Sequence, residues 1–219
     1  MKVVPMLDRE TLANGNFSQA FKDVPGIDLW SDERIEASMQ QTLAQRPANE
    51  PVWLFAYGSL IWNPLFEFAE SCVATLEGWR RSFCIRLLIG RASPAQPGRM
   101  MSLVRGSSIA GLALRLSEEN LEHELRIVWR REMIGGAYCP EWAPVTLQDG
   151  RTVQAIIFRA NPDSRMHEAD DNIETIAPMI AAAQGPLGTN RDYVEKLDHA
   201  LQSYGIQDDY IRELVQKLD

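Results

Sequence analysis

An unbroken apolar run over residues 52–57, ended by Gly58, constrains this chain more than any other feature. A strand with one solvated face alternates apolar and polar residues, whereas a continuous run is typical of a strand buried on both faces. Further strand-like runs follow at residues 72–76, 81–88, 100–104, 109–116 and 152–159. The middle of the chain is therefore predicted to form a sheet that holds residues 52–57 as a buried strand.

Helical patterns lie on both sides of this strand-rich middle. Before it they cover residues 9–22 and a segment that starts at Ser31, a good N-cap. One helix is predicted within it, over residues 118–133, and the pattern becomes helical again after residue 170, with Asn190 as a cap. Strands in the middle and helices at both ends predict an α+β fold rather than alternating βαβ units.

Residues 46–51 are polar and contain two prolines, which predicts an extended connector at this point of the chain. We expect residues 1–50 to form an N-terminal helical arm packed on the core. Residues 51–219 are expected to form the main domain.

Composition narrows the functional classes. The chain has 219 residues, 45% of them hydrophobic, and a formal net charge of −8, which predicts a folded protein without a nucleic-acid groove. No apolar stretch approaches a membrane span or the core of a signal peptide, and three cysteines without a C-x-x-C pair indicate neither a disulfide framework nor a zinc site. We expect a cytoplasmic protein, with a monomer favoured.

Cofactor and metal motifs are missing from the sequence: it has no P-loop, dinucleotide fingerprint or H-E-x-x-H pattern. The three histidines are isolated from one another. The default expectation is a small-molecule enzyme or binder that works without metal or cofactor.

Glu132 is the first residue whose position suggests chemistry. At about 100° per residue, Leu121, Leu125 and Val128 form the buried stripe of the predicted helix, and Glu132 falls within it. A carboxylate on a buried face is costly unless it is paired, hydrogen-bonded or protonated. Both a catalytic group and a structural ion pair, for example with Arg131, fit this pattern.

The turn from Tyr57 to Leu60 directly follows the buried strand. Because Gly58 allows backbone angles closed to other residues, the amides of this turn could converge on an anion or a developing oxyanion. An ordinary strand-to-loop turn fits equally well. No glycine follows two residues after Ser59, so this is not the nucleophile elbow of a hydrolase.

Arginines are concentrated between residues 78 and 116. This segment holds seven of them and no acidic residue, at positions Arg80, Arg81, Arg86, Arg91, Arg99, Arg105 and Arg115. Arginine favours bidentate contacts to carboxylates. Most of the seven are expected to pair with acidic helices of the fold, and one or two could hold a small anionic substrate.

With these residues in place, the sequence resembles the ChaC family of γ-glutamylcyclotransferases, in its glutathione-specific branch. The resemblance covers about residues 53–197 and implies a mixed, largely antiparallel, barrel-like sheet of about six strands with flanking helices. Five motifs carry it in order: residues 53–62, Arg80-Arg81-Ser82-Phe83, Gln96-Pro97-Gly98-Arg99, Arg131-Glu132 with Gly135-Gly136-Ala137-Tyr138, and residues 185–193.

The resemblance also implies site residues. The family's catalytic acid–base glutamate maps onto Glu132, and its tyrosine onto Tyr138, although the intervening segment is longer here. Arg81 or Arg99 is a candidate for a substrate carboxylate. The substrate loop maps onto Leu54, Phe55, Ala56, Tyr57, Gly58 and Ser59, extended here to Leu60, with Ala56 in place of the family's first glycine.

The implied reaction is an intramolecular aminolysis that splits glutathione into 5-oxoproline and cysteinylglycine without metal or cofactor. A cyclotransferase acting on other γ-glutamyl amines or dipeptides would use the same chemistry. Two further functions stay open: a non-catalytic binding or regulatory protein linked to cation transport, and a serine hydrolase that uses Ser59.

Overall fold

Two long antiparallel strands form the body of the fold. The computed structural model describes residues 7–22 and 24–218. In it, β2 (Glu70–Leu87) and β3 (Gly98–Arg115) each contain 18 residues and pair from Glu70 opposite Arg115 to Leu87 opposite Gly98. The register shifts twice along the pair, once at Gly78, which has a φ of 79°. Such bulges bend long strands, so β2 and β3 can curve around a core.

Within the described chain, five strands close into a barrel in the order β1, β3, β2, β4, β5. The shortest is β1 (Trp53–Ala56), which pairs antiparallel with β3 and parallel with β5 (Thr152–Ala160). All four residues of β1 are buried, which confirms the prediction of a strand covered on both faces. β4 (Tyr138–Leu147) runs antiparallel to β5 and completes the closure against β2.

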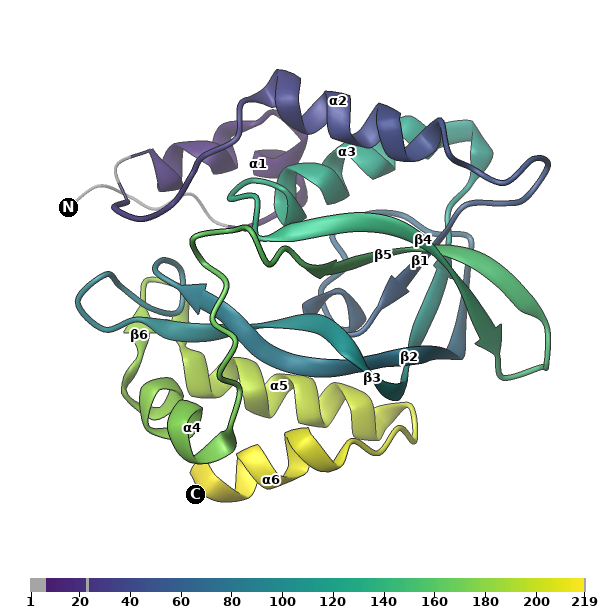
Figure 1. Cartoon of the computed structure of the whole chain (residues 1–219). Coiled ribbons are helices and arrows are strands. Elements are labelled where there is room, and N and C mark those ends of the chain that lie inside the picture. The colour runs from purple at the N-terminus through teal and green to yellow at the C-terminus, as the bar shows by residue number, and fades with distance from the viewer. Residues whose placement is uncertain (1–6, 23, 219) are drawn as a thin grey trace.

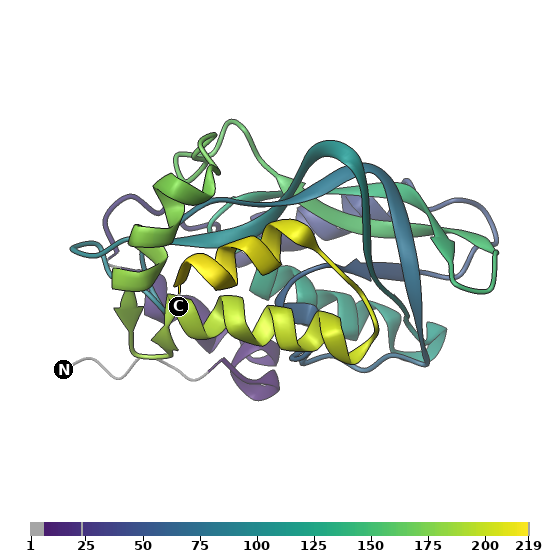
Figure 2. The same ribbon diagram turned by 90° about the horizontal axis from the view of Figure 1, so that it is seen from below.

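Helices cover the barrel in two layers (Figure 1). The upper layer contains α1 (Arg9–Ala13), α2 (Asp32–Leu43) and α3 (Leu121–Glu132), with α3 in contact with the other two. In the lower layer α5 (Asn190–Ser203) packs against α6 (Asp209–Leu218) and α4 (Ile173–Ala182), as Figure 2 shows from below. Short elements complete the fold: 3₁₀ helices at Asn16–Phe21, Ser59–Ile61 and Glu118–Asn120, and the strand pair β6 (Gln184–Gly185) and β7 (Gly188–Thr189).

The α+β class and the barrel-like sheet are confirmed, with differences in detail. The four predicted runs between 72 and 116 are two continuous strands, because bulges bend them without ending them. Strand β4 was not predicted, since two prolines interrupt its hydrophobic pattern. Residues 46–51 do connect α2 to β1, but they include a turn in which the Glu50 amide donates to the Pro47 carbonyl.

Helix ends differ from the predictions in three places. Gly15, with a φ of 76°, divides the first predicted helix into α1 and a 3₁₀ helix. The helix predicted from residue 118 begins with a 3₁₀ turn and becomes α-helical only at Leu121. Thr189 caps α5 in place of Asn190, because the Thr189 hydroxyl accepts from the Asp192 amide. The N-cap predicted at Ser31 is confirmed.

A buried ion pair fastens the start of the chain to α3. Both guanidinium nitrogens of Arg9 donate to the Glu124 carboxylate, at 2.7 and 2.6 Å, and the Glu67 amide donates to the same group at 2.7 Å. Glu124 itself is only 2% exposed. Burial alone would raise the pKa of Glu124, but the Arg9 guanidinium and the Glu67 amide hold it below its ordinary value. Arg126 and Arg130 of α3 add contacts to Glu36 and to the end of α1.

Within the described part of the chain, the structure contains no helix that is both long enough and apolar enough to cross a membrane.

We expect Arg9→Met to lower the free energy of unfolding by about 2 kcal/mol, because it leaves a buried carboxylate with only one hydrogen bond. Urea unfolding of the variant and the parent measures this difference. Arg212→Met is the matched control, since Arg212 pairs with the fully exposed Asp209 and should change stability by no more than about 0.5 kcal/mol. An Arg9→Met protein as stable as the parent would contradict the proposed anchoring.

Candidate active site

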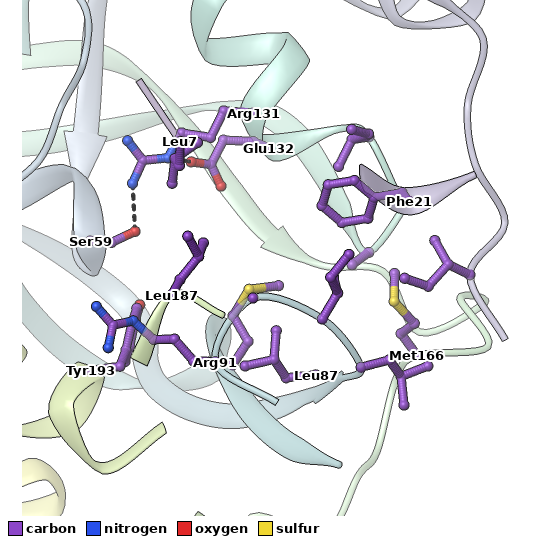
Figure 3. Close-up of a pocket in the computed structure, with 18 of the residues that line it drawn as sticks. Leu7, Phe21, Ser59, Leu87, Arg91, Arg131, Glu132, Met166, Leu187 and Tyr193 are labelled. Carbon is purple, nitrogen blue, oxygen red and sulfur yellow. Dashed lines mark hydrogen bonds and ion pairs between the residues drawn. The ribbon is translucent and has the colours of Figure 1, made fainter. Parts of the chain in front are cut away.

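A cavity of about 350 Å³ opens at the end of the barrel where both helical layers meet. The C-terminal end of α3, the N-terminal end of α5 and the hairpin between β2 and β3 all reach it, and in Figure 1 they lie at the left. A smaller recess of about 20 Å³ adjoins it and shares Ser59, Glu132, Tyr138 and Tyr193 with it. Figure 3 shows Arg131, Glu132 and Ser59 together at one end of the cavity.

Glu132 is the last residue of α3 and points into this cavity. Leu121, Leu125 and Val128 are buried, as the helical periodicity predicted, and the same face carries Glu132, whose side chain is 13% exposed. Arg131 Nε lies 3.2 Å from Glu132 Oε1. Burial raises the pKa of Glu132 above its ordinary value, although the Arg131 charge acts in the opposite direction.

Comparison with Glu124 separates the two readings of a buried carboxylate on this helix. Glu124 receives three hydrogen bonds, and the pKa of that carboxyl is lowered. Glu132 faces a cavity, and the pKa of its carboxyl is raised. Glu124 has the environment of a structural ion pair, whereas Glu132 has that of a group able to take up and release a proton.

Three phenols surround Glu132. The Tyr138 hydroxyl donates to the Met101 carbonyl at 2.9 Å, and the Tyr57 hydroxyl donates to the Phe158 carbonyl. Burial and the Glu132 charge together raise the pKa of Tyr193 to about 12, and burial raises the pKa of the Tyr57 and Tyr138 hydroxyls well above its ordinary value. All three therefore stay protonated near neutral pH, so Glu132 is the group of this cluster suited to accept a proton.

Of the predicted substrate loop, only its second half lines the site. Leu54, Phe55 and Ala56 belong to β1 and are buried in the core. Tyr57, Gly58, Ser59 and Leu60 line the small recess, facing Glu132 and Tyr193 across it.

Close packing explains the glycine of this turn. The φ of Gly58 is −132°, which is outside the left-handed region. A Cβ at this position would lie 3.0 Å from the Tyr193 hydroxyl. The Ser59 hydroxyl accepts a hydrogen bond from Arg131 Nη2 at 2.8 Å, which links the turn to α3.

The structure distinguishes the two candidate arginines. Arg81 is 1% exposed, and its guanidinium donates to Tyr57 O, Ala110 O and Asp208 Oδ2 at 2.7–2.8 Å. It lies outside the residues that line the cavity, so its role is to hold β2 to its neighbours.

Arg99 does line the cavity and is 4% exposed. Its Nε and Nη1 have no hydrogen-bond partner among the described residues, and Nη1 lies 3.5 Å from the Glu168 carboxylate. A buried guanidinium with open donors is costly unless something else binds it.

The remaining arginines of the basic segment also divide into those that line the cavity and those that do not. Arg80, Arg105 and Arg115 contact Asp171, Trp79 and Glu70, respectively, away from the cavity. Arg86 and Arg91 line the cavity beside Arg99.

Asn190 and Tyr193 were predicted only to lie in a helix, yet both belong to the site. The Asn190 side chain accepts from the Arg99 amide at 2.7 Å and donates to the Arg99 carbonyl at 3.0 Å, so it fixes Arg99 against α5. Tyr193 lies one turn further along α5 and reaches Gly58. Both residues fall in the motif at residues 185–193, and that motif was the available signal for them.

Metal ligands do not gather in the described residues: no group of three histidine, cysteine, aspartate or glutamate side chains is placed to hold an ion.

The raised pKa of Glu132 predicts a specific dependence of stability on pH. The folded protein holds this proton to higher pH than the unfolded chain does, so folding stability is lost as the pH rises from the ordinary value of 4.5 through the folded-state pKa. Glu132→Gln removes this loss. We expect the variant and the parent to have similar urea midpoints at pH values below 4.5. As the pH rises above that value, the variant should become more stable than the parent. A difference that does not change with pH would refute the raised pKa.

Comparison with known proteins shows the family of this chain. The family model described as "ChaC-like protein" matches residues 52–219. The glutathione-specific γ-glutamylcyclotransferase of Escherichia coli K12 is 49% identical over 96% of this chain and 91% of its own length, and human glutathione-specific γ-glutamylcyclotransferase 1 is 29% identical over 78% and 82%. A crystal structure of the yeast cyclotransferase specific to glutathione superposes with a TM-score of 0.71 at 19% identity, covering 78% of this chain and 96% of that one, which shows a shared fold. The chain belongs to the ChaC-like protein family.

Proposed function

We propose that this protein is a glutathione-specific γ-glutamylcyclotransferase that converts glutathione into 5-oxo-L-proline and L-cysteinylglycine. The observation that carries the proposal is Glu132, a buried carboxylate with a raised pKa that faces a cavity of about 350 Å³. That volume is at the lower end of the range for small-molecule sites, which suits a tripeptide. The 49% identical E. coli relative has the same activity in its name.

The reaction needs no enzyme nucleophile. The α-amine of the γ-glutamyl group attacks its own γ-carbonyl, and the ring closes as the amide C–N bond to cysteinylglycine breaks. The α-ammonium loses two protons in becoming the lactam N–H, one before the attack and one as the ring closes, and the departing nitrogen gains two in leaving as an ammonium. The enzyme supplies the bent substrate conformation, which converts the step into a well-oriented intramolecular reaction.

Glu132 is suited to both proton transfers. Its carboxylate accepts one proton from the α-ammonium and passes it to the departing nitrogen, and the regenerated carboxylate then relays the second proton from the ring nitrogen to the released amine. General acid–base catalysis is most effective when the pKa of the group lies near the working pH, and burial shifts Glu132 in that direction. Arg131, which contacts both Glu132 and the Ser59 hydroxyl, keeps the carboxylate oriented toward the turn.

Arg99 and the turn at residues 57–60 are the proposed substrate ligands. Arg99 lines the cavity, and its guanidinium suits a substrate carboxylate because charge-assisted hydrogen bonds to carboxylates are strong. Ser59 and Tyr193 supply hydroxyls in the recess that they line together with Glu132. Tyr138 lines the same recess, and its hydroxyl already donates to the Met101 carbonyl.

A serine hydrolase would lack a histidine base at this site. The Ser59 hydroxyl accepts from Arg131, which cannot deprotonate it, and none of the three histidines lines either part of the site in the described chain. A monomer working in the cytoplasm is also part of the proposal. The three cysteines are unpaired, which suits the reducing conditions of that compartment.

The direct test measures 5-oxoproline release from glutathione, with chelator present, by the parent and by Glu132→Gln. We expect turnover by the parent and a loss of about 100-fold or more in the variant. γ-Glutamyl-alanine is the parallel substrate. Turnover of that compound alone would support the cyclisation chemistry and reject the glutathione specificity. A folded variant as active as the parent would make Glu132 structural, and no turnover of either substrate would favour a binding protein.

A second test separates the two buried arginines. Arg99→Met should raise KM for glutathione on the order of 10-fold or more, because a charged hydrogen bond contributes about 1.5–3 kcal/mol, and it should leave stability unchanged or higher. Arg81→Met should lower the free energy of unfolding by about 3 kcal/mol, since it leaves Asp208 and two backbone carbonyls without their buried hydrogen-bond donor. Equal KM values for Arg99→Met and the parent would exclude Arg99 as a substrate ligand.

A further inference from the structure

The active-site cavity has two chemically different ends. Its polar end holds Ser59, Arg131 and Glu132, and apolar side chains that include Phe21, Leu87 and Met166 form its other end (Figure 3). Arg86, Arg91 and Arg99 also line the cavity. If the γ-glutamyl group occupies the polar end beside Glu132, the leaving cysteinylglycine must extend toward the apolar end. The side chain next to the scissile amide then meets an apolar surface.

Much of that apolar surface comes from the N-terminal arm. Phe17, Phe21 and Ile27 line the cavity, and the rings of Phe17 and Phe21 meet edge to face at 5.2 Å. These residues precede the segment 52–219 that the family model matches. The arm therefore adds a wall to the site that the matched domain does not itself provide.

Close contacts hold this wall against the segment that follows Glu132. The Trp30 amide donates to the Ile134 carbonyl at 3.0 Å. A Cβ on Gly136, which has a φ of 61°, would lie 2.4 Å from Trp30 Nε1, so the arm requires a glycine there. A Cβ on Gly135 would lie 2.7 Å from Met166 Cε and 3.5 Å from Ile27 Cγ2. The wall and the catalytic carboxylate thus have a fixed spacing.

We propose that the arm forms the subsite for the leaving amine, an inference that rests on the proposed function. The arm would select substrates in which the residue that supplies the leaving amine has an apolar side chain. A thiol meets this requirement, and sulfur makes favourable contacts with aromatic rings. A short S-alkyl thioether meets it better still. The chemical class of substrate is therefore widened from glutathione to its S-alkyl conjugates, in which the same amide C–N bond breaks and the C–S bond remains intact.

Three matched substrates test this selection: glutathione, S-methylglutathione and γ-glutamyl-serylglycine, which replaces the thiol with a hydroxyl. For the parent we expect kcat/KM for S-methylglutathione to equal or exceed that for glutathione. The hydroxyl analogue should be at least about 10-fold poorer, because an unpaired hydroxyl in apolar surroundings costs about 1–3 kcal/mol.

Phe21→Ala tests the role of the arm. We expect it to raise KM for the two sulfur substrates with kcat little changed, and to leave kcat/KM for the hydroxyl analogue nearly unaltered, so the preference of about 10-fold shrinks. Phe21→Leu should restore the preference. Phe68→Ala is the control, since Phe68 is 41% exposed and lies outside the cavity. Ile27→Ala gives a second arm variant if Phe21→Ala does not fold.

The outcomes separate the two proposals. A parent that releases no 5-oxoproline from any of the three substrates overturns the proposed function, and the subsite falls with it. A parent that cleaves glutathione but treats the three substrates alike overturns the subsite alone. Equal losses on all three substrates in both arm variants would also overturn it, because they indicate a merely structural arm.

Discussion

The burial of α3 between the arm and the barrel is the constraint on which the site depends. This helix presents two carboxylates to the interior, and the fold treats them in opposite ways. Arg9 and the Glu67 amide donate hydrogen bonds to Glu124, and the Arg9 contact holds the arm against the helix. Glu132 has Arg131 as a neighbouring cation and faces a cavity. Its loss of contact with water raises the pKa of its carboxyl, which suits the group for proton transfer.

The same contrast governs the arginines. Arg81 satisfies its donors with backbone carbonyls and Asp208 and thereby holds β2, the turn after β1 and the loop before α6 together. Arg99 is also buried, but Asn190 binds only its backbone. Its Nε and Nη1 form no hydrogen bond among the described residues, and Nη1 lies 3.5 Å from the Glu168 carboxylate. Unsatisfied polar groups are rare in folded interiors, which is why an open guanidinium in a cavity favours an anionic ligand.

Much of the fold was readable from hydrophobic periodicity, and so was the position of Glu132. The buried run at residues 52–57 and the stripe on α3 depend on local spacing, and the structure confirms both. Strand continuity was not readable, since bulges at Gly78 and beyond break the pattern of β2 without ending its pairing. The sequence also could not distinguish the surroundings of Arg81 from those of Arg99, because the partners of both arginines lie more than twenty residues away along the chain.

By itself, the sequence determined the α+β class, the buried strand and the place of Glu132 on an apolar helix face, because each follows from the order of neighbouring residues. Tertiary structure alone decided which arginine has open donors and that Tyr193 approaches Gly58. It also placed Phe17 and Phe21 of the arm in the wall of the cavity. These outcomes depend on contacts between segments far apart in the chain, and periodicity contains no information on which distant segments will meet.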